Sequence, residues 1–235
     1  MNSTLKLVVS ATAIVVCGAA CSPAATAPPS AADTSSPGPS SGQHIATLTV
    51  AGTDVSSSPL SLTVTLPAGW ESIQFGADNG TSSPPAGMAF IVSLVDNMFT
   101  NPCVHTEQSP KVGPTVADLA TALGQVPDTT ATKPVQTTIA GYQATYIELA
   151  IPATLPCTPS EFYLWQDSPG GDWWIQGLNE TARIWILEVG GQRVAFLTHA
   201  YPGSGSNPKA AFEAILNSVV FDSTSTQPSP SASGS

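Results

Sequence analysis

The four cysteines are the side chains of this sequence best suited to covalent chemistry. Cys17 and Cys21 lie in an apolar N-terminal stretch, whereas Cys103 and Cys157 lie in the middle of the chain. Thiols pair in oxidising compartments, so two cysteines that remain in an exported chain are expected to form a disulfide. We predict that Cys103 and Cys157 are joined, with Cys17 removed and Cys21 modified during export.

The N-terminus has the three parts of a secretory signal. Lys6 precedes an apolar run over 7–16, and small residues at 18–20 precede Cys21. The run is too short to cross a membrane as a helix. A cysteine directly after such a cleavage site is typical of bacterial lipoproteins, whose thiol is acylated, for example with palmitate. We therefore predict a signal peptide over 1–20 and a lipid anchor at Cys21 in the extracytoplasmic face of the cell membrane.

A zinc site is the alternative use of the central cysteines. Cys103 and His105 have C-x-H spacing, and Cys157 with His199 could complete four ligands. Zinc sites usually contain close C-x-x-C or H-x-x-x-H pairs, which this sequence lacks. The disulfide is the preferred interpretation, and no metal or cofactor is predicted.

Histidine and acidic side chains offer two routes to hydrolysis. His105 and His199 accompany neither a G-x-S-x-G serine nor an H-E-x-x-H motif. Glu161, Asp167 and Asp172 flank aromatic segments, as the two carboxylates of a glycosidase flank a sugar. With sixteen acidic residues in the chain, a chance cluster of this kind is expected. No catalytic residue is predicted, and a cell-envelope hydrolase with its site near the aromatic strands is the alternative function.

Aromatic residues gather between 162 and 185. Consecutive side chains of a strand point to opposite faces, so Trp173 and Trp174 cannot both enter one core. One of them either covers the other face of the sheet or lines a groove, unless a helix covers each face. A sugar ring or an acyl chain could bind on such a surface. The ligand-binding candidates are Tyr163, Trp165, Trp174 and Trp185.

Charge excludes one class of partner. Charged residues make up 9% of the chain, and the formal net charge is -10. Loss of Lys6 with the signal leaves five cationic against sixteen acidic side chains. Such a polyanion is repelled by phosphate backbones and by anionic headgroups. We predict no nucleic-acid partner, and an acyl chain must supply the attachment to the membrane.

Two segments without large apolar side chains flank a single domain. Residues 22–43 and 223–235 consist mostly of Ser, Pro, Ala, Thr and Gly. Such segments cannot bury enough apolar surface to offset the entropy lost on ordering. We predict a disordered tether over 21–43, one domain over 44–222 and a disordered tail over 223–235.

Periodicity within the domain predicts an α+β fold with a mainly antiparallel sheet and two helices packed on it. Thr115, with Asp118 three residues later, is a capping box for the first helix, and Asn207-Pro208 begins the second. Gly190-Gly191 is suited to a tight hairpin turn. The expected helices are 116–125 and the segment after Asn207, and the expected strands are 45–50, 60–66, 88–95, 135–139, 142–151, 162–166, 173–177, 183–189, 193–201 and 220–221.

Several segments together resemble a known group of proteins. They are LTVTLPAGW ending at Trp70, NPC at 101–103, GPTVADLATAL at 113–123, TIAGYQATYIELAIP at 138–152 and RIWILEV at 183–189. The set resembles uncharacterised actinobacterial lipoproteins. The element order with a closing AFEAILNSVVF helix is similar to the PsbP-like fold of LpqN-type mycobacterial lipoproteins. The resemblance covers about 60–222 and implies a PsbP-like sandwich without defined catalytic residues. Gly18 departs from the Leu that lipoboxes usually have three residues before the cysteine.

These observations together predict a role outside the cell. We expect a membrane-anchored extracytoplasmic lipoprotein that acts as a non-catalytic binding or interaction module for an envelope lipid, glycan or protein.

Overall fold

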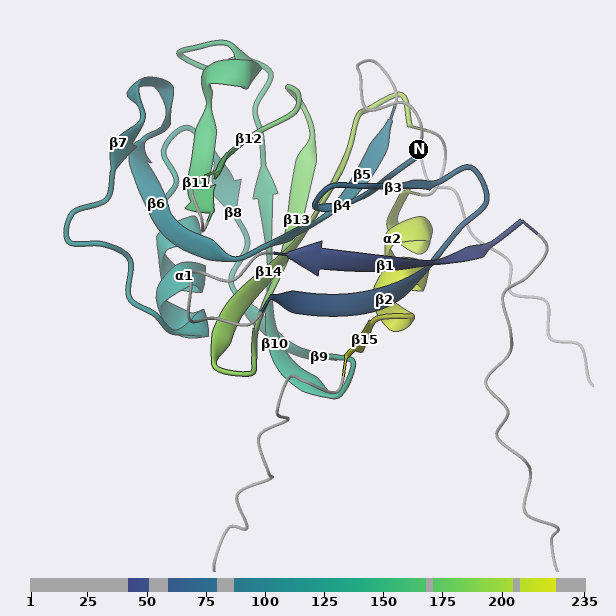
Figure 1. The fold of residues 1–235 in the computed structure, drawn as a ribbon. Coiled ribbons are helices and arrows are strands. Elements are labelled where there is room, and N and C mark those ends of the chain that lie inside the picture. Colours follow the sequence, from purple (N-terminus) through teal and green to yellow (C-terminus); the bar gives the residue numbers. More distant parts are fainter. Residues whose placement is uncertain (1–41, 51–58, 80–86, 168–170, 205–207, 223–235) are drawn as a thin grey trace, which may run out of the picture. The chain divides into compact units, whose positions relative to one another are not determined.

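Strands form most of the regular structure. The computed structural model describes residues 42–50, 59–79, 87–167, 171–204 and 208–222, all of which belong to one unit, residues 38–235. Within these ranges there are fifteen strands and two α-helices, and the strands pair antiparallel (Figure 1). The predicted α+β class is confirmed, and the PsbP-like assignment stays a prediction.

The largest sheet has eight strands and supplies the framework. Its order is β3-β4-β5-β14-β13-β10-β8, with β9 also paired to β10. Two tight turns set its register: Gly190 and Gly191 have φ of 59° and 79°, and Ala140 and Gly141 have φ of 50° and 83°. The bounds are β3 (Glu71–Ile73), β4 (Gly76–Asp78), β5 (Met88–Ser93), β8 (Thr130–Ala131), β9 (Val135–Ile139), β10 (Tyr142–Ala150), β13 (Thr181–Val189) and β14 (Gln192–Ala200).

One face of this sheet packs against a second, smaller sheet and a helix. The smaller sheet has the order β1-β2-β15, from β1 (His44–Val50), β2 (Leu60–Leu66) and β15 (Val220–Phe221). Helix α2 (Pro208–Asn217) contributes Phe212, Ile215 and Leu216 to the same buried cluster. The predicted pairing of 45–50 with 60–66 and the return of 220–221 to a sheet are confirmed.

The opposite face packs against a third sheet and the first helix. That sheet has the order β12-β11-β6-β7, from β6 (Val95–Asn101), β7 (Thr106–Glu107), β11 (Tyr163–Asp167) and β12 (Gly171–Trp174). Helix α1 (Val116–Leu123) adds Leu119, Ala120 and Leu123 to a second buried cluster. Both faces of β13 are therefore apolar: Ile186 belongs to this cluster and Leu187 to the first, and neither is exposed.

The predicted cap of α1 forms as expected. The backbone N–H of Asp118 donates to Thr115 Oγ1 at 3.1 Å, and the N–H of Thr115 donates to Asp118 Oδ2 at 3.0 Å. These bonds satisfy donors that a helix start leaves unpaired. The helix ends at Leu123, two residues before the predicted end.

Two predicted strands have wrong boundaries. The apolar run 88–95 forms β5 and the start of β6. These strands lie in different sheets, because the chain passes at Leu94 from the eight-stranded sheet to the third sheet. Hydrophobic periodicity does not mark such a change of sheet, since both strands are buried. The second aromatic strand is β12 at 171–174 rather than 173–177.

Several predictions lie outside the described residues. These are the signal peptide over 1–20, the lipidation of Cys21, most of the tether, the cap Asn207 and the tail over 223–235. Within the described ranges, neither helix has the length and apolar character needed to cross a bilayer.

Candidate ligand-binding surface

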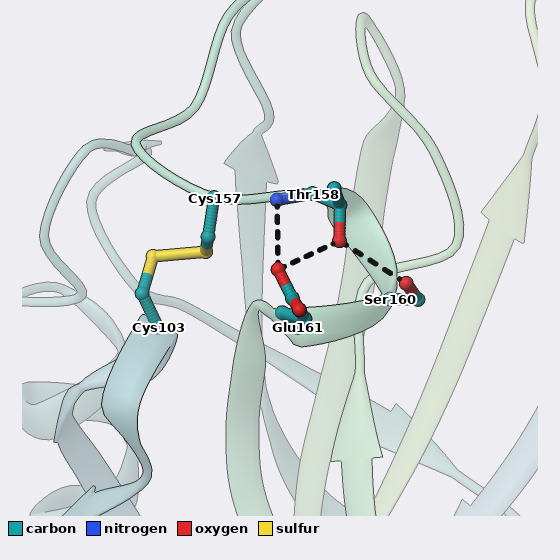
Figure 2. The surroundings of a disulfide bond; sticks show 5 residues. All are labelled: Cys103, Cys157, Thr158, Ser160 and Glu161. Carbon is teal, nitrogen blue, oxygen red and sulfur yellow. Dashed lines mark hydrogen bonds between the residues drawn. A yellow bond between two sulfur atoms is a disulfide. The ribbon is translucent and has the colours of Figure 1, made fainter.

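A disulfide links a short 3-10 helix to the segment that leads into a second one. Cys103 in η1 (Pro102–Val104) bonds Cys157, which lies just before η2 (Pro159–Glu161), with the Cα atoms 5.7 Å apart (Figure 2). The bond spans 54 residues of sequence, for which loop-closure entropy gives about 4 kcal/mol of stabilisation. Both sulfurs are engaged in this bond, so neither is available as a zinc ligand in this structure. The described ranges contain no cluster of three potential metal ligands.

The segment beyond Cys157 is fixed by its own hydrogen bonds. Glu161 Oε2 accepts from Thr158 Oγ1 at 3.0 Å and from the Thr158 backbone N–H at 3.4 Å, and Ser160 Oγ lies 3.2 Å from Thr158 Oγ1 (Figure 2). Glu161 therefore caps η2, which gives this carboxylate a structural role in place of the glycosidase role considered above.

Trp165 lies in the core and not at the surface. It pairs with Trp173 across β11 and β12 and with Met98 across β11 and β6. Its side chain is 0% exposed, whereas Trp173 packs partly buried against the same cluster. Directly paired residues share one face of a sheet, so Trp165, Trp173 and Met98 all face the core. Trp165 has no surface to offer a ligand.

Tyr163 and Trp174 are cross-strand partners that are both more exposed than Trp165. Trp174 has 38% of its surface exposed. Its ring stacks on that of Trp173, with the centroids 6.1 Å apart, so the expected separation of these two side chains onto opposite faces is not seen. Tyr163 would share the inner face with Trp165 in a regular strand. The pairing register shifts between these two residues, so Tyr163 pairs with Trp174 instead. A bulge of this kind moves side chains to the other face.

A continuous series of rings follows on this side, and we call it the outer aromatic face: Phe99, His105, Tyr163 and Trp174. The ring centroids of His105 and Tyr163 are 3.9 Å apart, and those of Tyr163 and Trp174 are 5.8 Å apart. Phe99 lies 5.9 Å from His105 and 6.0 Å from Tyr163, which cover it. His105 reaches this position with a left-handed φ of 53°, directly after η1. Strained backbone at a non-glycine residue is often found at functional sites.

Polar side chains border these rings. Gln166 and Asp172 are cross-strand partners that follow Trp165 and precede Trp173, so both point outward. Gln166 Nε2 donates to Glu107 Oε1 at 3.5 Å, and Glu107 is the cross-strand partner of Phe99. The outer aromatic face therefore has two carboxylates beside it.

Trp185 lies elsewhere, in a cleft of about 380 Å³ between α2 and the strands β9, β10 and β13. Its ring lies 4.7 Å from that of its cross-strand partner Tyr146, and Phe212 and Leu216 of α2 form the opposite wall. This volume is at the small end of the range of about 300–1,000 Å³ for ligand pockets. The four candidates thus divide between the outer aromatic face, the cleft and the core.

Two polar side chains of this cleft, Tyr146 and Arg183, are engaged with Glu148. Tyr146 Oη donates a short hydrogen bond to Glu148, and Arg183 Nε lies 3.3 Å from the same carboxylate. Burial and the neighbouring Glu148 raise the pKa of Tyr146, so its phenol remains protonated at neutral pH. The arrangement suits binding by aromatic contact better than proton transfer.

A buried ionisable pair lies beneath Trp174 and was not predicted from the sequence. Glu180 Oε2 and His199 Nδ1 are 3.7 Å apart, with side chains 1% and 4% exposed. Burial raises the pKa of Glu180 to about 7, despite hydrogen bonds from the backbone N–H groups of Gln176 and Gly177, and lowers the pKa of His199 to about 4. The cavity that they line with Trp173 and Trp174 is only about 10 Å³, which is too small for a substrate.

Asp167 is a further acidic side chain with a raised pKa, and it is half-buried. Burial raises its pKa to about 7, and Ser93 Oγ donates to its Oδ2 at 3.3 Å. A glycosidase needs two carboxyl groups across an open cleft. The Asp167 carboxyl, at the end of β11, is bonded to Ser93, and neither Asp167 nor Asp172 lines the cleft at Trp185 or the cavity at Glu180.

Comparison of the chain with protein-family models, with curated proteins and with solved structures gives no match. The resemblance to actinobacterial lipoproteins therefore stays a prediction.

The buried carboxyl groups make stability depend on pH. Asp167 and Glu180 have ordinary pKa values of 3.8 and 4.5, and both rise to about 7 in the fold. The folded state thus holds two protons that the unfolded chain has lost, while His199 lacks one that the unfolded chain binds. From about pH 5 to 6.5 the free energy of unfolding should fall by about 1.4 kcal/mol per pH unit.

Urea titrations at several pH values measure this slope. In the variant Glu180→Gln the contributions of Asp167 and His199 oppose each other, so we expect a nearly flat profile. A variant that keeps the wild-type slope, or a wild-type stability that rises over this interval, would contradict the assignment.

Proposed function

We propose that this protein is a lipid-anchored extracytoplasmic binding module without a catalytic role, which contacts an envelope lipid, glycan or protein through its outer aromatic face. The exposed ring of Trp174 beside Tyr163 and His105 carries the proposal. Monomeric domains bury most large aromatic side chains, and contiguous exposed ones are typical of interaction sites.

The rigidity of the face supports a binding role. Two strands, the left-handed residue His105 and the Cys103–Cys157 bond hold the rings in place. A surface that is ordered before binding loses little conformational entropy when a ligand arrives. The rings are therefore suited to recognition without a conformational change.

The predicted anchor and tether suit the same role. A flexible chain over 22–43 would span roughly 25 Å, which keeps the domain clear of the headgroups while confining it to the membrane surface. The proposal includes the kinship with LpqN-type lipoproteins of PsbP-like fold, which an antiparallel sheet with two packed helices supports.

A cell-envelope hydrolase is the alternative, and two buried carboxyl groups with raised pKa values favour it, since general acids share this property. Glu180 is nevertheless enclosed beside a cavity of about 10 Å³, and the Asp167 carboxyl is bonded to Ser93. Binding through exposed rings needs no such opening, so it is the better supported function.

The anchor is tested by mass spectrometry of the protein isolated from its native membrane. We expect the mature chain to begin at Cys21 and to carry a diacyl or triacyl adduct. The variant Cys21→Ser should lose the adduct and the membrane association. An unmodified chain that is freely secreted would contradict the anchor.

The binding surface is tested by crosslinking in intact cells. A photoreactive amino acid replaces Gln166 on the outer face in one variant and Gln136, which lines the cleft, in another. We expect a defined adduct, protein or lipid, from position 166 and a much weaker one from position 136. Adducts from position 136 alone would assign binding to the cleft, and none from either position would contradict the proposal.

A further inference from the structure

The sheet that carries the outer aromatic face contains no cationic residue. Its four strands and the two 3-10 helices beside it include no Lys or Arg, and the chain has none between Pro134 and Ala182. Negative potential therefore accumulates over this sheet. The acidic residues of these elements are Asp96, Glu107, Glu161, Asp167 and Asp172.

The nearby cations are engaged in other contacts. Lys111 lies 2.5 Å from Asp96. The Arg193 guanidinium donates to the backbone carbonyl of Val95 at 2.9 Å and to that of Gly113. Neither cation pairs with Glu107 or Asp172 on the outer face.

The two outward carboxylates lie beside the rings. Glu107 is paired with Phe99 across β6 and β7, and its Oε1 accepts from Gln166. Asp172 in β12 is the cross-strand partner of Gln166. It directly precedes Trp173 and Trp174, the last residues of that strand. Aromatic faces attract cations placed within about 6 Å of the ring centroid. The rings and the carboxylates of this surface therefore both favour a positively charged ligand.

We propose that the outer aromatic face binds the cationic side chains, above all arginine, of an extended segment of a partner protein. This inference rests on the proposed function and specifies the chemistry of its ligand. A guanidinium can stack on Trp174 and at the same time bond a carboxylate with two parallel N–H groups, which an ammonium cannot do.

The other ligand classes fit this surface less well. An acyl chain would take Asp172 and Glu107 out of water without a compensating partner, which is costly. A neutral sugar gains nothing from the two charges, and an anionic ligand is repelled by them. The rings of His105, Tyr163 and Trp174 follow one another at 3.9 Å and 5.8 Å, which suits several side chains of one segment better than a single small cation.

Calorimetric titration of the purified full-length chain tests the inference. The probe is a synthetic peptide of alternating Arg and Gly, and the matched ligand has citrulline in place of each Arg, which keeps the shape and removes the charge. We expect binding of the Arg peptide alone, weakened by added salt. Trp174→Ala and Asp172→Asn should each weaken it about three- to tenfold, as is usual for cation–π and exposed charge contacts.

Glu213→Gln is the matched control, since it removes one exposed carboxylate from α2, which belongs to the opposite face of the central sheet. It should leave the affinity unchanged, and thermal melting should show that all three variants fold. Equal loss in Glu213→Gln and Asp172→Asn, or equal binding of both peptides, would overturn the inference.

The test separates this inference from the proposed function. If the Arg peptide does not bind while the crosslink from position 166 persists, the face binds another ligand and only the inference fails. Binding of neutral phospholipid vesicles that is lost in Trp174→Ala, without binding of the Arg peptide, would assign the surface to lipid. Loss of both the crosslink and the peptide binding would remove the proposed function as well.

Discussion

The strict alternation of side chains in a sheet that is covered on both faces determines this structure. In β13, Ile186 and Leu187 follow each other and are both fully buried, yet they belong to different clusters. The central strands must therefore be apolar at nearly every position, and a layer must cover each side. The three-stranded sheet and α2 cover one face of the central sheet. The four-stranded sheet and α1 cover the other face.

The outer aromatic face is a consequence of the same rule applied to the covering sheet. That sheet has only one face on the core, so every second residue points away from it. Trp165 is enclosed, whereas Gln166 and Asp172 are partly exposed and Trp174 is exposed. The register shift before Trp165 adds Tyr163 to the outer set. Two aromatic residues in succession thus supply both core packing and a surface ring.

Local signals allowed much of the fold to be predicted from the sequence. The capping box of Thr115, the glycine turn at Gly190 and the alternation over 60–66 act within a few residues, and each formed as expected. The passage from β5 to β6 at Leu94 could not be predicted, because it depends on which sheet each strand joins. Trp185 and Trp174 are separated for the same reason, since their strands β13 and β12 join different sheets. Glu180 was missed because an acid in a loop is usually exposed; its only sequence signal is a histidine on a buried strand.

The central claim is that Trp174 lies at the surface at the end of β12 while Trp165 is enclosed. Hydroxyl-radical footprinting of the native protein, read by mass spectrometry at each tryptophan, measures this directly. The account predicts rapid modification of Trp174 and strong protection of Trp165, with the difference lost on unfolding in urea. Protection of Trp174, or modification of Trp165 in the folded protein at a comparable rate, would contradict it.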